Sequence, residues 1–425
     1  MIVSARLSLL SLIAAGLLVG ATPGLGQAGA MPHHPIAHKI VKKSGNKPGK
    51  AAPVPPPAPV GPPPVAPLAF ANTPAPPELP NSPSYILIDD QTGAVIAEKS
   101  PNTPWPPASL TKLMTAYLTY QAIAHGTIKL DQAVPVSVTA WHTGGSRMFI
   151  SPSMHPTVDQ LLHGLIIDSG NDAAVALAQA VAGNRSAFVG LMNHAAAQLQ
   201  MTGTHYTNVD GLPDPDLHTT ATDLGILSRA IIAKYPQFLK ISAEKHYTFD
   251  KIRQRSWNPV LFRDKTVDGL KTGRTKAAGR CIDATALRNG RRLIAIVLGG
   301  PSFKASTNDI EALLDYGYQF YADQTIVSAG KILATAQAPT LEPASFPVGA
   351  AKSLVMTLPV NAQSVLKTNV ALNGPFKGAI AQGAVVGTIT VSANGKTIAT
   401  VPAVALAAAK PAGFFTMLMR RLHHL

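Results

Sequence analysis

The stretch Pro107-Ala108-Ser109-Leu110-Thr111-Lys112-Leu113-Met114-Thr115 determines how the first half of this chain is interpreted. Prolines precede Ser109 and apolar residues recur at helical spacing after it, which predicts a helix that begins at or near Ser109. Lys112 follows three residues later and therefore faces the same side of that helix. A buried lysine can accept the proton of a neighbouring hydroxyl, so Ser109 is a candidate nucleophile and Lys112 its candidate base.

A second motif, Ser169-Gly170-Asn171, lies between two apolar helical patterns. Ser169 offers a hydroxyl that can relay a proton, and Asn171 offers an amide that can hold a substrate carbonyl. The same residues are also typical of a turn between two helices that is capped by Asn171 or Asp172. The motif alone therefore leaves both interpretations open.

A third motif lies in the run DGLKTGRT at residues 268–275, which is predicted to be a strand. Lys271 adds positive charge, Thr272 can donate to a carboxylate, and Gly273 would let a substrate approach the backbone closely. A basic edge strand accounts for Lys271 and Arg274. It does not account for Gly273, which follows Thr272 directly and precedes Thr275 by two residues.

The elements around these motifs indicate the fold class. A hairpin is predicted from strands at 85–90 and 94–98, and helical patterns then dominate until strands return. Asn289-Gly290 predicts a tight turn between further strands, and a helix is expected at 308–321. Strands at both ends with helices between them predict an α+β fold, an antiparallel sheet flanked by helices.

The sequence changes character after residue 324. Short runs rich in Val, Thr and Ile predict a small all-β domain at 325–410, in which Asn394-Gly395 marks a hairpin. Residues 411–425 are predicted to form an amphipathic helix with Phe414 and Phe415 on its apolar face. Such a helix either lies on a membrane surface or packs on its own domain.

The amino-terminal segment predicts export. Residues 1–30 have the charged start, apolar run and small-residue site of a signal peptide, and residues 31–83 form a Pro/Ala-rich linker. The net charge of +14 favours anionic partners, and export argues against nucleic acid. The single cysteine, Cys281, lies in an apolar run and is expected to be buried and unreactive.

In this order the three motifs match Ser-x-x-Lys, Ser-x-Asn and Lys-Thr-Gly, the signature of penicillin-binding proteins and serine β-lactamases. More closely, the chain resembles the D-alanyl-D-alanine carboxypeptidases, the low-molecular-mass penicillin-binding proteins of peptidase family S11. The resemblance rests on residues 107–115, 169–173, 207–212 and 268–275. It implies a transpeptidase-like catalytic domain at 84–324, followed by the family's carboxy-terminal domain and membrane anchor.

The resemblance also implies an activity without cofactor or metal. Ser109 would attack the bond between two terminal D-alanines of a peptidoglycan stem peptide, and β-lactams would acylate the same serine. The enzyme would be periplasmic and attached peripherally to the inner membrane through its C-terminal helix. In this resemblance Lys112 would be the base, Ser169 would relay a proton to the leaving amine, and Asn171 would orient the substrate amide. Lys271 would give electrostatic support, and substrate would bind beside Gly273. The main-chain amides of Ser109 and Arg274 would bind the oxyanion, and Thr272 and Thr275 would bind the terminal carboxylate.

One position departs from the family. Relatives commonly carry an arginine a few residues after the glycine pair that ends the last strand, and this chain has Ser306 there. We expect Arg274 to compensate. The alternatives are a DD-endopeptidase, a β-lactamase, for which no Glu-x-x-Leu-Asn motif is found between Asn171 and Lys271, and a catalytically silent wall-binding scaffold.

Overall fold

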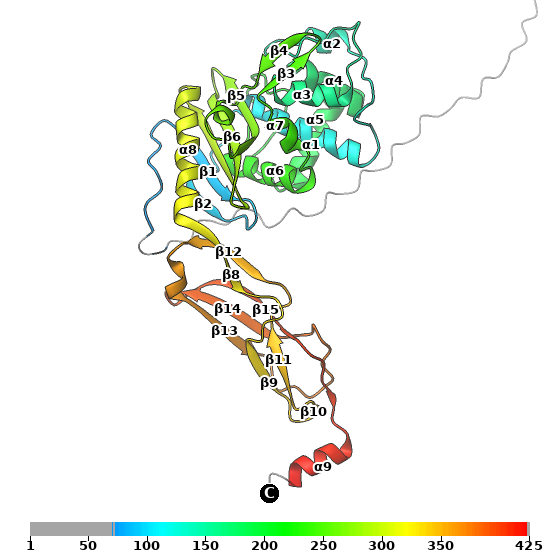
Figure 1. Cartoon of the computed structure of the whole chain (residues 1–425). Coiled ribbons are helices and arrows are strands. Elements are labelled where there is room, and N and C mark those ends of the chain that lie inside the picture. The colour runs from blue at the N-terminus through cyan, green and yellow to red at the C-terminus, as the bar shows by residue number, and fades with distance from the viewer. Residues whose placement is uncertain (1–69, 71–72, 423–425) are drawn as a thin grey trace, which may run out of the picture. The chain divides into compact units, whose positions relative to one another are not determined.

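A computed structural model of the chain describes residue 70 and residues 73–422 (Figure 1). The predicted signal peptide and most of the predicted linker lie outside the described residues. The first group of elements, called the α+β region below, comprises β1 (Ser84–Asp89), β2 (Val95–Lys99), η1 (Ala108–Leu110), α1 (Thr111–Ala124), α2 (Val138–Trp141), α3 (Val158–Ile166), α4 (Asn171–Ala182), α5 (Arg185–Gln198), α6 (Ala221–Lys234), α7 (Phe238–Ser242), β3 (His246–Phe249), β4 (Ile252–Arg255), η2 (Pro259–Phe262), β5 (Val267–Thr275), β6 (Gly279–Arg288), β7 (Arg291–Gly300) and α8 (Phe303–Phe320).

A second group follows, called the β region below. It comprises β8 (Tyr321–Val327), β9 (Ala334–Gln337), β10 (Leu341–Glu342), β11 (Ser345–Gly349), β12 (Leu354–Pro359), η3 (Ala362–Val365), β13 (Leu366–Leu372), β14 (Val385–Ala393), β15 (Lys396–Ala405) and β16 (Lys410–Pro411). The last described helix is α9 (Phe414–Leu422).

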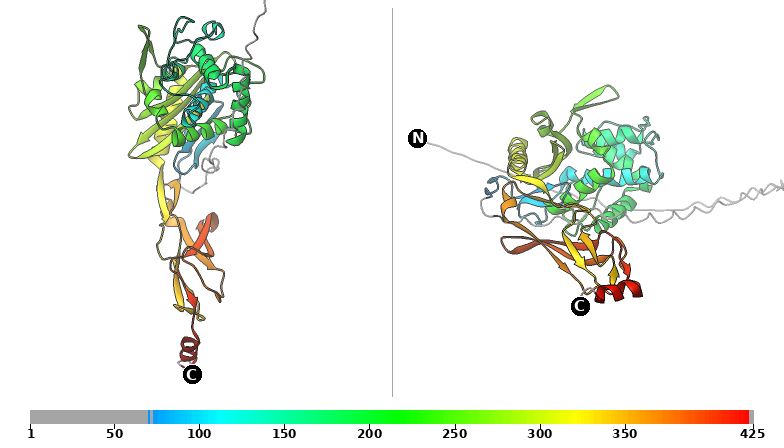
Figure 2. Two further views of the ribbon diagram at one scale, coloured as in Figure 1. Left: turned by 90° about the vertical axis from the view of Figure 1, so that its right-hand side faces the viewer. Right: turned by 60° about the horizontal axis from the view of Figure 1, so that its bottom comes forward.

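The α+β region is built on a five-stranded antiparallel sheet in the order β2-β1-β7-β6-β5. All six residues of β1 are buried because helices cover both faces of the sheet. Ile86 and Ile88 pack on one face with α1 and α6, whereas Leu87 packs on the other face with α8. Figures 1 and 2 show α8, in yellow, on the side of the sheet opposite the helical cluster. The predicted antiparallel sheet flanked by helices is confirmed.

Local sequence signals account for most element boundaries. Asn289 and Gly290 have φ values of 51° and 80°, as the tight turn between β6 and β7 requires. Helix α8 begins five residues earlier than predicted, since the Ser302 side chain accepts a hydrogen bond from the Ala305 N–H and caps it. The β3–β4 hairpin was not predicted from the sequence, because each of its strands has only four residues and most of these residues are exposed.

Most of the β region forms a second antiparallel sheet, in the order β13-β14-β15-β11-β9. Asn394 and Gly395 have φ values of 51° and 79° and make the predicted β14–β15 turn. The core of the β region is apolar and includes the fully buried Ile389. No helix in residues 73–422 is long and apolar enough to span a membrane.

Candidate active site

The nucleophile candidate Ser109 lies in η1, immediately before α1, as predicted. Two glycines let other segments pack against this turn. A Cβ on Gly211, whose φ is 85°, would overlap the main-chain oxygen of Ala108, and a Cβ on Gly273 would lie 2.8 Å from the Pro107 oxygen. Gly273 is therefore needed for packing of β5 against the nucleophile's own turn, as well as for any approach of substrate.

Lys112 connects the first motif to two distant segments. Its Nζ lies 3.0 Å from Ser109 Oγ, 2.7 Å from Asn171 Oδ1 and 2.6 Å from the main-chain oxygen of Asp210. The amide and carbonyl oxygens can only accept hydrogen bonds, whereas the serine hydroxyl can donate one. A neutral amine has two N–H groups for these two acceptors, and its lone pair is then left for the Ser109 hydroxyl.

Burial favours this neutral amine. Lys112 is fully buried, and desolvation lowers its pKa to about 8, although the carboxylates of Asp210 and Asp172 act in the opposite direction. Lys271 is also buried, and desolvation followed by repulsion from Lys112 lowers its pKa well below the usual lysine value. The site thus holds two lysines whose charged forms are disfavoured.

Ser169 and Lys271 meet on the other side of the site. Lys271 Nζ donates to Ser169 Oγ at 3.0 Å and to the main-chain oxygen of Thr272 at 3.1 Å. The preceding residue, Asp168, is buried, and burial together with the nearby Asp172 raises its pKa to about 7, while Lys271 lowers it. Ser169 therefore lies beside an amine that donates a hydrogen bond to its oxygen.

The Asn171 side chain is held at both ends. Its Oδ1 accepts from Lys112, and its Nδ2 donates to the main-chain oxygen of Gly144 at 2.6 Å. The neighbouring Asp172 accepts hydrogen bonds from the N–H groups of three consecutive residues, at Met148, Phe149 and Ile150. The loop before residue 150 is thereby fastened to the start of α4, and one Asn171 N–H remains available to a substrate.

These side chains border a cleft of about 360 Å³. The predicted residues Ser109, Ser169, Asn171 and 272–275 line it, whereas Lys112 and Lys271 lie buried behind its wall. Within residues 73–422 no group of three or more His, Cys, Asp or Glu side chains lies close enough to hold a metal ion. Residues that sequence analysis did not assign to the site also line the cleft, namely Gly145, Ser146, Asp210, Gly211, Leu212, Trp257 and Phe303.

The cleft residues that were not predicted are of two kinds: some lie in a recognisable motif, and others do not. Asp210 and Gly211 belong to the run at 207–212 that carries part of the resemblance, so a signal for them was present. Trp257 lies in the loop between β4 and η2 and follows no sequence motif. The Arg274 guanidinium lies 5.8 Å from the centre of the Trp257 ring, so the two side chains form one corner of the cleft.

Ser306 does not face the cleft. It is fully buried, and its Oγ donates to the main-chain oxygen of Arg280 at 3.1 Å. Arg274 is exposed and lines the cleft. Between the two positions, only Arg274 can present a charged side chain to a substrate.

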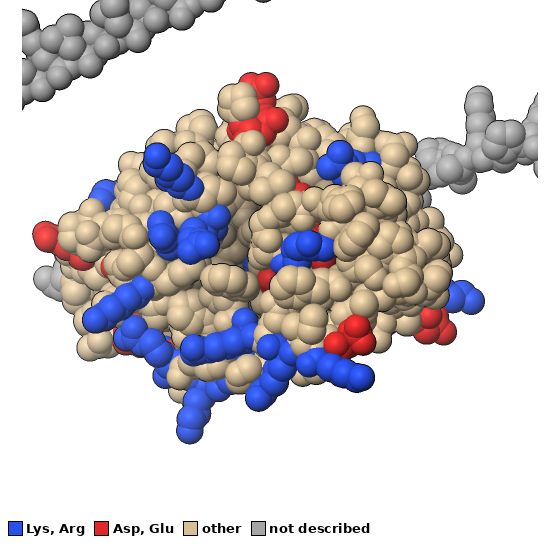
Figure 3. Space-filling view, turned by 90° about the horizontal axis from the view of Figure 1, so that it is seen from above, with Lys and Arg blue, Asp and Glu red and all other residues tan. Residues whose placement is uncertain are grey.

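Positive charge extends beyond the cleft. Figure 3 shows the molecule from above the view of Figure 1, and Lys and Arg side chains gather along the lower edge of that face. Exposed basic residues in and next to β4 and β5 are Lys251, Arg253, Arg255, Arg274 and Lys276. Such a surface attracts anionic substrates and polymers.

The buried Cys281 takes no part in this site. Burial raises the pKa of its thiol to about 12, so the thiol stays protonated and is a poor nucleophile. The prediction of a small buried apolar residue is confirmed.

The chain is similar to known proteins in both sequence and structure. The chain matches the Peptidase S11 family, D-alanyl-D-alanine carboxypeptidase, over residues 71–302. Residues 321–410 match the C-terminal domain of penicillin-binding protein 5. The first match therefore includes β1 to β7 of the α+β region, and the second lies in the β region.

Individual proteins give the same result. The chain is 37% identical to D-alanyl-D-alanine carboxypeptidase DacC of Escherichia coli over 340 residues, 78% of this chain and 85% of DacC. The structure resembles penicillin-binding protein 5 from Haemophilus influenzae with a TM-score of 0.72 and 32% identity, covering 79% of this chain and 99% of that one. It also resembles a cefotaxime-bound penicillin-binding protein from Listeria monocytogenes, with a TM-score of 0.54 and 29% identity over 57% of this chain and all of that one. The chain belongs to the Peptidase S11 family of D-alanyl-D-alanine carboxypeptidases, which are serine-type hydrolases that act on peptidoglycan.

Proposed function

We propose that Ser109 carries out this hydrolysis by attacking the carbonyl carbon between the two terminal D-alanines of a stem peptide. The placement of Lys112 supports the proposal most strongly, because its two acceptor-only neighbours leave the amine lone pair for the Ser109 proton. Attack forms the Ser109 ester and breaks the peptide bond, and the terminal D-alanine leaves as its amine. Water then hydrolyses the ester.

Ser169 passes a proton to the leaving amine. Its hydroxyl oxygen accepts a hydrogen bond from Lys271 at 3.0 Å, which stabilises that oxygen while its proton moves to the amine. The proton that Lys112 took from Ser109 then replaces the Ser169 proton, so no net proton is gained or lost. The oxyanion is bound by the main-chain N–H groups of Ser109 and Arg274. Strand β5 supports this role because it is an edge strand of the sheet and has main-chain groups available on the cleft side. Asn171 orients the substrate amide through its remaining N–H.

The terminal carboxylate is bound by Thr272, Thr275 and Arg274. Thr275 Oγ1 accepts the N–H of Ala278 at 2.9 Å, so its own proton is available to a carboxylate. We expect Arg274→Ala to lower D-alanine release more than tenfold, because a charge-assisted bond to the carboxylate is lost. Lys276→Ala is the matched control, since Lys276 is exposed nearby but does not line the cleft. A loss of tenfold or less in Arg274→Ala would argue against this role.

The same serine is acylated by β-lactams, as the cefotaxime-bound relative suggests. The first test is incubation with fluorescent penicillin, location of the label by peptide mass, and an assay of D-alanine release from diacetyl-Lys-D-Ala-D-Ala. Label on Ser109 together with release supports the proposal. Label without release would favour an endopeptidase, and absence of label would overturn the serine mechanism.

Helix α9 attaches the exported enzyme to the periplasmic surface of the inner membrane. Phe414 and Phe415 are 76% and 79% exposed, and Leu418 and Met419 are also exposed on this short helix. Flotation with anionic vesicles tests the attachment. We expect the chain to float with the vesicles and a Phe414→Ser, Phe415→Ser double variant to remain in solution. Equal flotation of both proteins would contradict the role of α9.

A further inference from the structure

The β3–β4 hairpin is anchored by one of its faces. Tyr247 and Phe249 pack against the core of the α+β region. The Gln254 side chain donates a hydrogen bond at 2.9 Å to a main-chain oxygen of the loop before residue 150. Residues that alternate with these point outward and pair across the two strands. The outward residues are His246, Thr248, Arg253 and Arg255.

The positive charge of the hairpin has no acidic partner among the described residues. Residues 245–257 contain four basic residues and one acidic residue, Asp250. All four basic side chains are exposed, and none lies within ion-pair distance of a carboxylate in residues 73–422. The basic residues that do pair with carboxylates in the α+β region include Arg263, Arg288, Arg291 and Arg292. The four unpaired residues, called the basic hairpin below, are Lys245, Lys251, Arg253 and Arg255.

The turn of this hairpin carries a lysine where comparable turns carry glycine. Asp250 and Lys251 form a two-residue connection with φ values of 43° and 67°. The residues that correspond to Lys251 in the β6–β7 and β14–β15 turns are Gly290 and Gly395. A side chain at such a φ strains the backbone, and strain of this kind is concentrated at functional positions. The turn therefore favours a cation at its tip over an unstrained backbone.

A hollow of about 440 Å³ connects the basic hairpin with the catalytic cleft. Trp257 and Phe303 line both the hollow and the cleft, so the two adjoin each other. Arg255 lines the hollow from the hairpin side, and its guanidinium lies 3.8 Å from the centre of the Phe262 ring. Stacking on this ring holds the charge in place. A polymer that leaves the cleft past Trp257 would meet the hairpin next.

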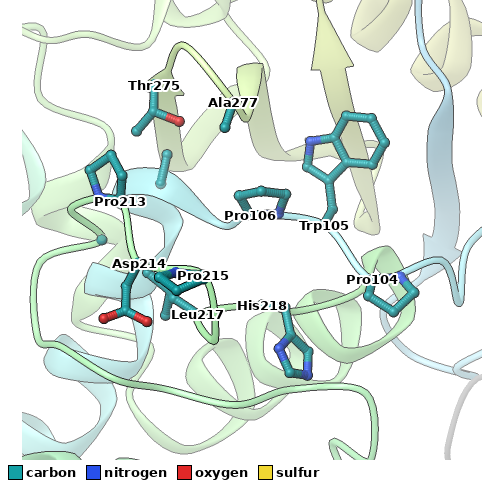
Figure 4. Close-up of a pocket in the computed structure, with 12 residues that line it drawn as sticks. Pro104, Trp105, Pro106, Pro213, Asp214, Pro215, Leu217, His218, Thr275 and Ala277 are labelled. Atoms are coloured by element: carbon teal, nitrogen blue, oxygen red, sulfur yellow. The ribbon is translucent and has the colours of Figure 1, made fainter.

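Another hollow that adjoins the cleft has the opposite charge. It has a volume of about 610 Å³ and shares Gly211 and Thr275 with the cleft (Figure 4). Its described lining residues include Asp214, which is labelled in Figure 4, and none of them is Lys or Arg. An anionic polymer is therefore attracted to the Trp257 side of the cleft and not to the Asp214 side.

We propose that the basic hairpin is a docking surface for the wall polymer, and that it binds the carboxylates of stem peptides next to the one held in the cleft. Every stem peptide that ends in D-alanine has a terminal carboxylate, so the polymer presents many anionic groups. Docking raises the concentration of further stem peptides at Ser109. The wall polymer is favoured over an anionic lipid surface because the hollow leads directly from the catalytic cleft to the hairpin. The proposal rests on the function proposed above, which supplies the polymer.

The test compares a polymeric substrate with a small one. The variant Lys251→Glu, Arg253→Glu reverses two charges of the basic hairpin. The matched control is Lys129→Glu, Arg185→Glu, which changes the net charge equally at exposed positions that line neither the cleft nor the hollow. At low salt we expect the hairpin variant to bind isolated peptidoglycan sacculi about tenfold more weakly in sedimentation, and to release D-alanine from them about tenfold more slowly. The difference should decline with added salt.

The small substrate checks that the catalytic site is intact. Release of D-alanine from diacetyl-Lys-D-Ala-D-Ala and penicillin labelling of Ser109 should be unchanged in both double variants. Sacculi whose carboxyl groups have been converted to amides should bind the unaltered chain and the hairpin variant equally, because the anionic groups have been removed. The turn gives a separate test, since Lys251→Gly should raise the melting temperature and still weaken binding to sacculi about threefold.

Equal binding of sacculi by the hairpin variant and its control would overturn the proposal. A difference that survives amidation of the sacculi, or that appears only with anionic lipid vesicles, would overturn it in favour of another anionic partner. Unchanged binding in Lys251→Gly would also contradict it. Sedimentation requires no catalysis, so it tests the hairpin even if absence of penicillin label and of D-alanine release overturns the proposed mechanism.

Discussion

The α+β region and the β region bury very different side chains. The α+β region buries Lys112, Lys271 and Asp283 almost completely, whereas the described buried side chains of the β region are apolar apart from Gln324 and Thr357. Burial of charge is costly unless partners compensate it or the group becomes neutral. The comparison indicates that burial in the first region shifts the pKa values of its lysines, whereas the core of the second region is almost entirely apolar.

The largest effect is expected at Lys112. Replacing it by methionine keeps the volume but removes the base, so we expect D-alanine release and penicillin labelling to fall about 10³-fold or more. Lys234→Met is the control, because Lys234 on α6 donates to the Tyr117 hydroxyl at 3.3 Å, away from Ser109. Both variants should retain the circular dichroism of the folded chain. Activity in Lys112→Met near that of the control would show that burial of this lysine serves packing only.

The next largest effect is expected at Gly211. An alanine there would overlap the Ala108 oxygen and displace the turn that carries Ser109, so labelling should fall about 100-fold, as misplaced catalytic groups do. The variant Gly126→Ala is the control that separates the effect of this overlap from the effect of backbone strain at a positive φ. Gly126 has a comparable φ of 72°, but nothing lies within 4 Å of its added Cβ. That variant should lose about 1 kcal/mol of stability and keep its activity. Equal losses of labelling in both would contradict the packing argument.

A smaller effect is expected from pH. Because the Lys112 pKa is lowered to about 8, the rate of acylation should rise about tenfold per unit below pH 8 and level off above it. The lowered Lys112 pKa also makes the folded chain more stable as the pH rises. Between pH 8 and the ordinary lysine pKa, the unfolded chain holds the proton and the folded chain does not, so the unfolding free energy rises with pH there. A flat pH profile of stopped-flow acylation from pH 6 to 9 would contradict a neutral Lys112.

The smallest effect on catalysis is expected in the β region. Ile389 is fully buried on β14, and Ile389→Ala should lower the stability of that region by about 2–4 kcal/mol. Penicillin labelling of Ser109 should not change, because Ile389 packs in the separate core of the β region. Thermal melting followed with and without penicillin checks both statements. Loss of labelling at temperatures where the variant is still folded would show that the two regions depend on each other.

Much of this architecture could be predicted because it follows from local signals. The β6–β7 turn at Asn289-Gly290, the helix after Ser109 and the strand at 267–275 all depend on neighbouring residues. The site was less predictable where its contacts are distant and chemically generic. Lys112 bonds to a main-chain oxygen at residue 210, and every residue has such an oxygen.

The corner formed by Trp257 and Arg274 illustrates the same limit. A tryptophan in a loop has no periodicity, and only the folded path of the chain brings it beside β5. The burial of Ser306 was also not predictable, since a serine at the start of a helix is usually exposed or capping. Long-range packing determined both outcomes.

Because Lys112 must be neutral to act as a base, the activity of the enzyme should depend on temperature through the pKa of this lysine. Loss of a proton from an ammonium group absorbs much heat, whereas loss from a carboxyl group absorbs little, so warming lowers the lysine pKa and leaves nearby carboxyl groups almost unchanged. The pH above which activity levels off, which is set by the Lys112 pKa of about 8, should therefore move towards neutral pH as the cell warms. Trimming of the wall at a fixed pH would then accelerate on warming by more than the chemical barrier alone requires.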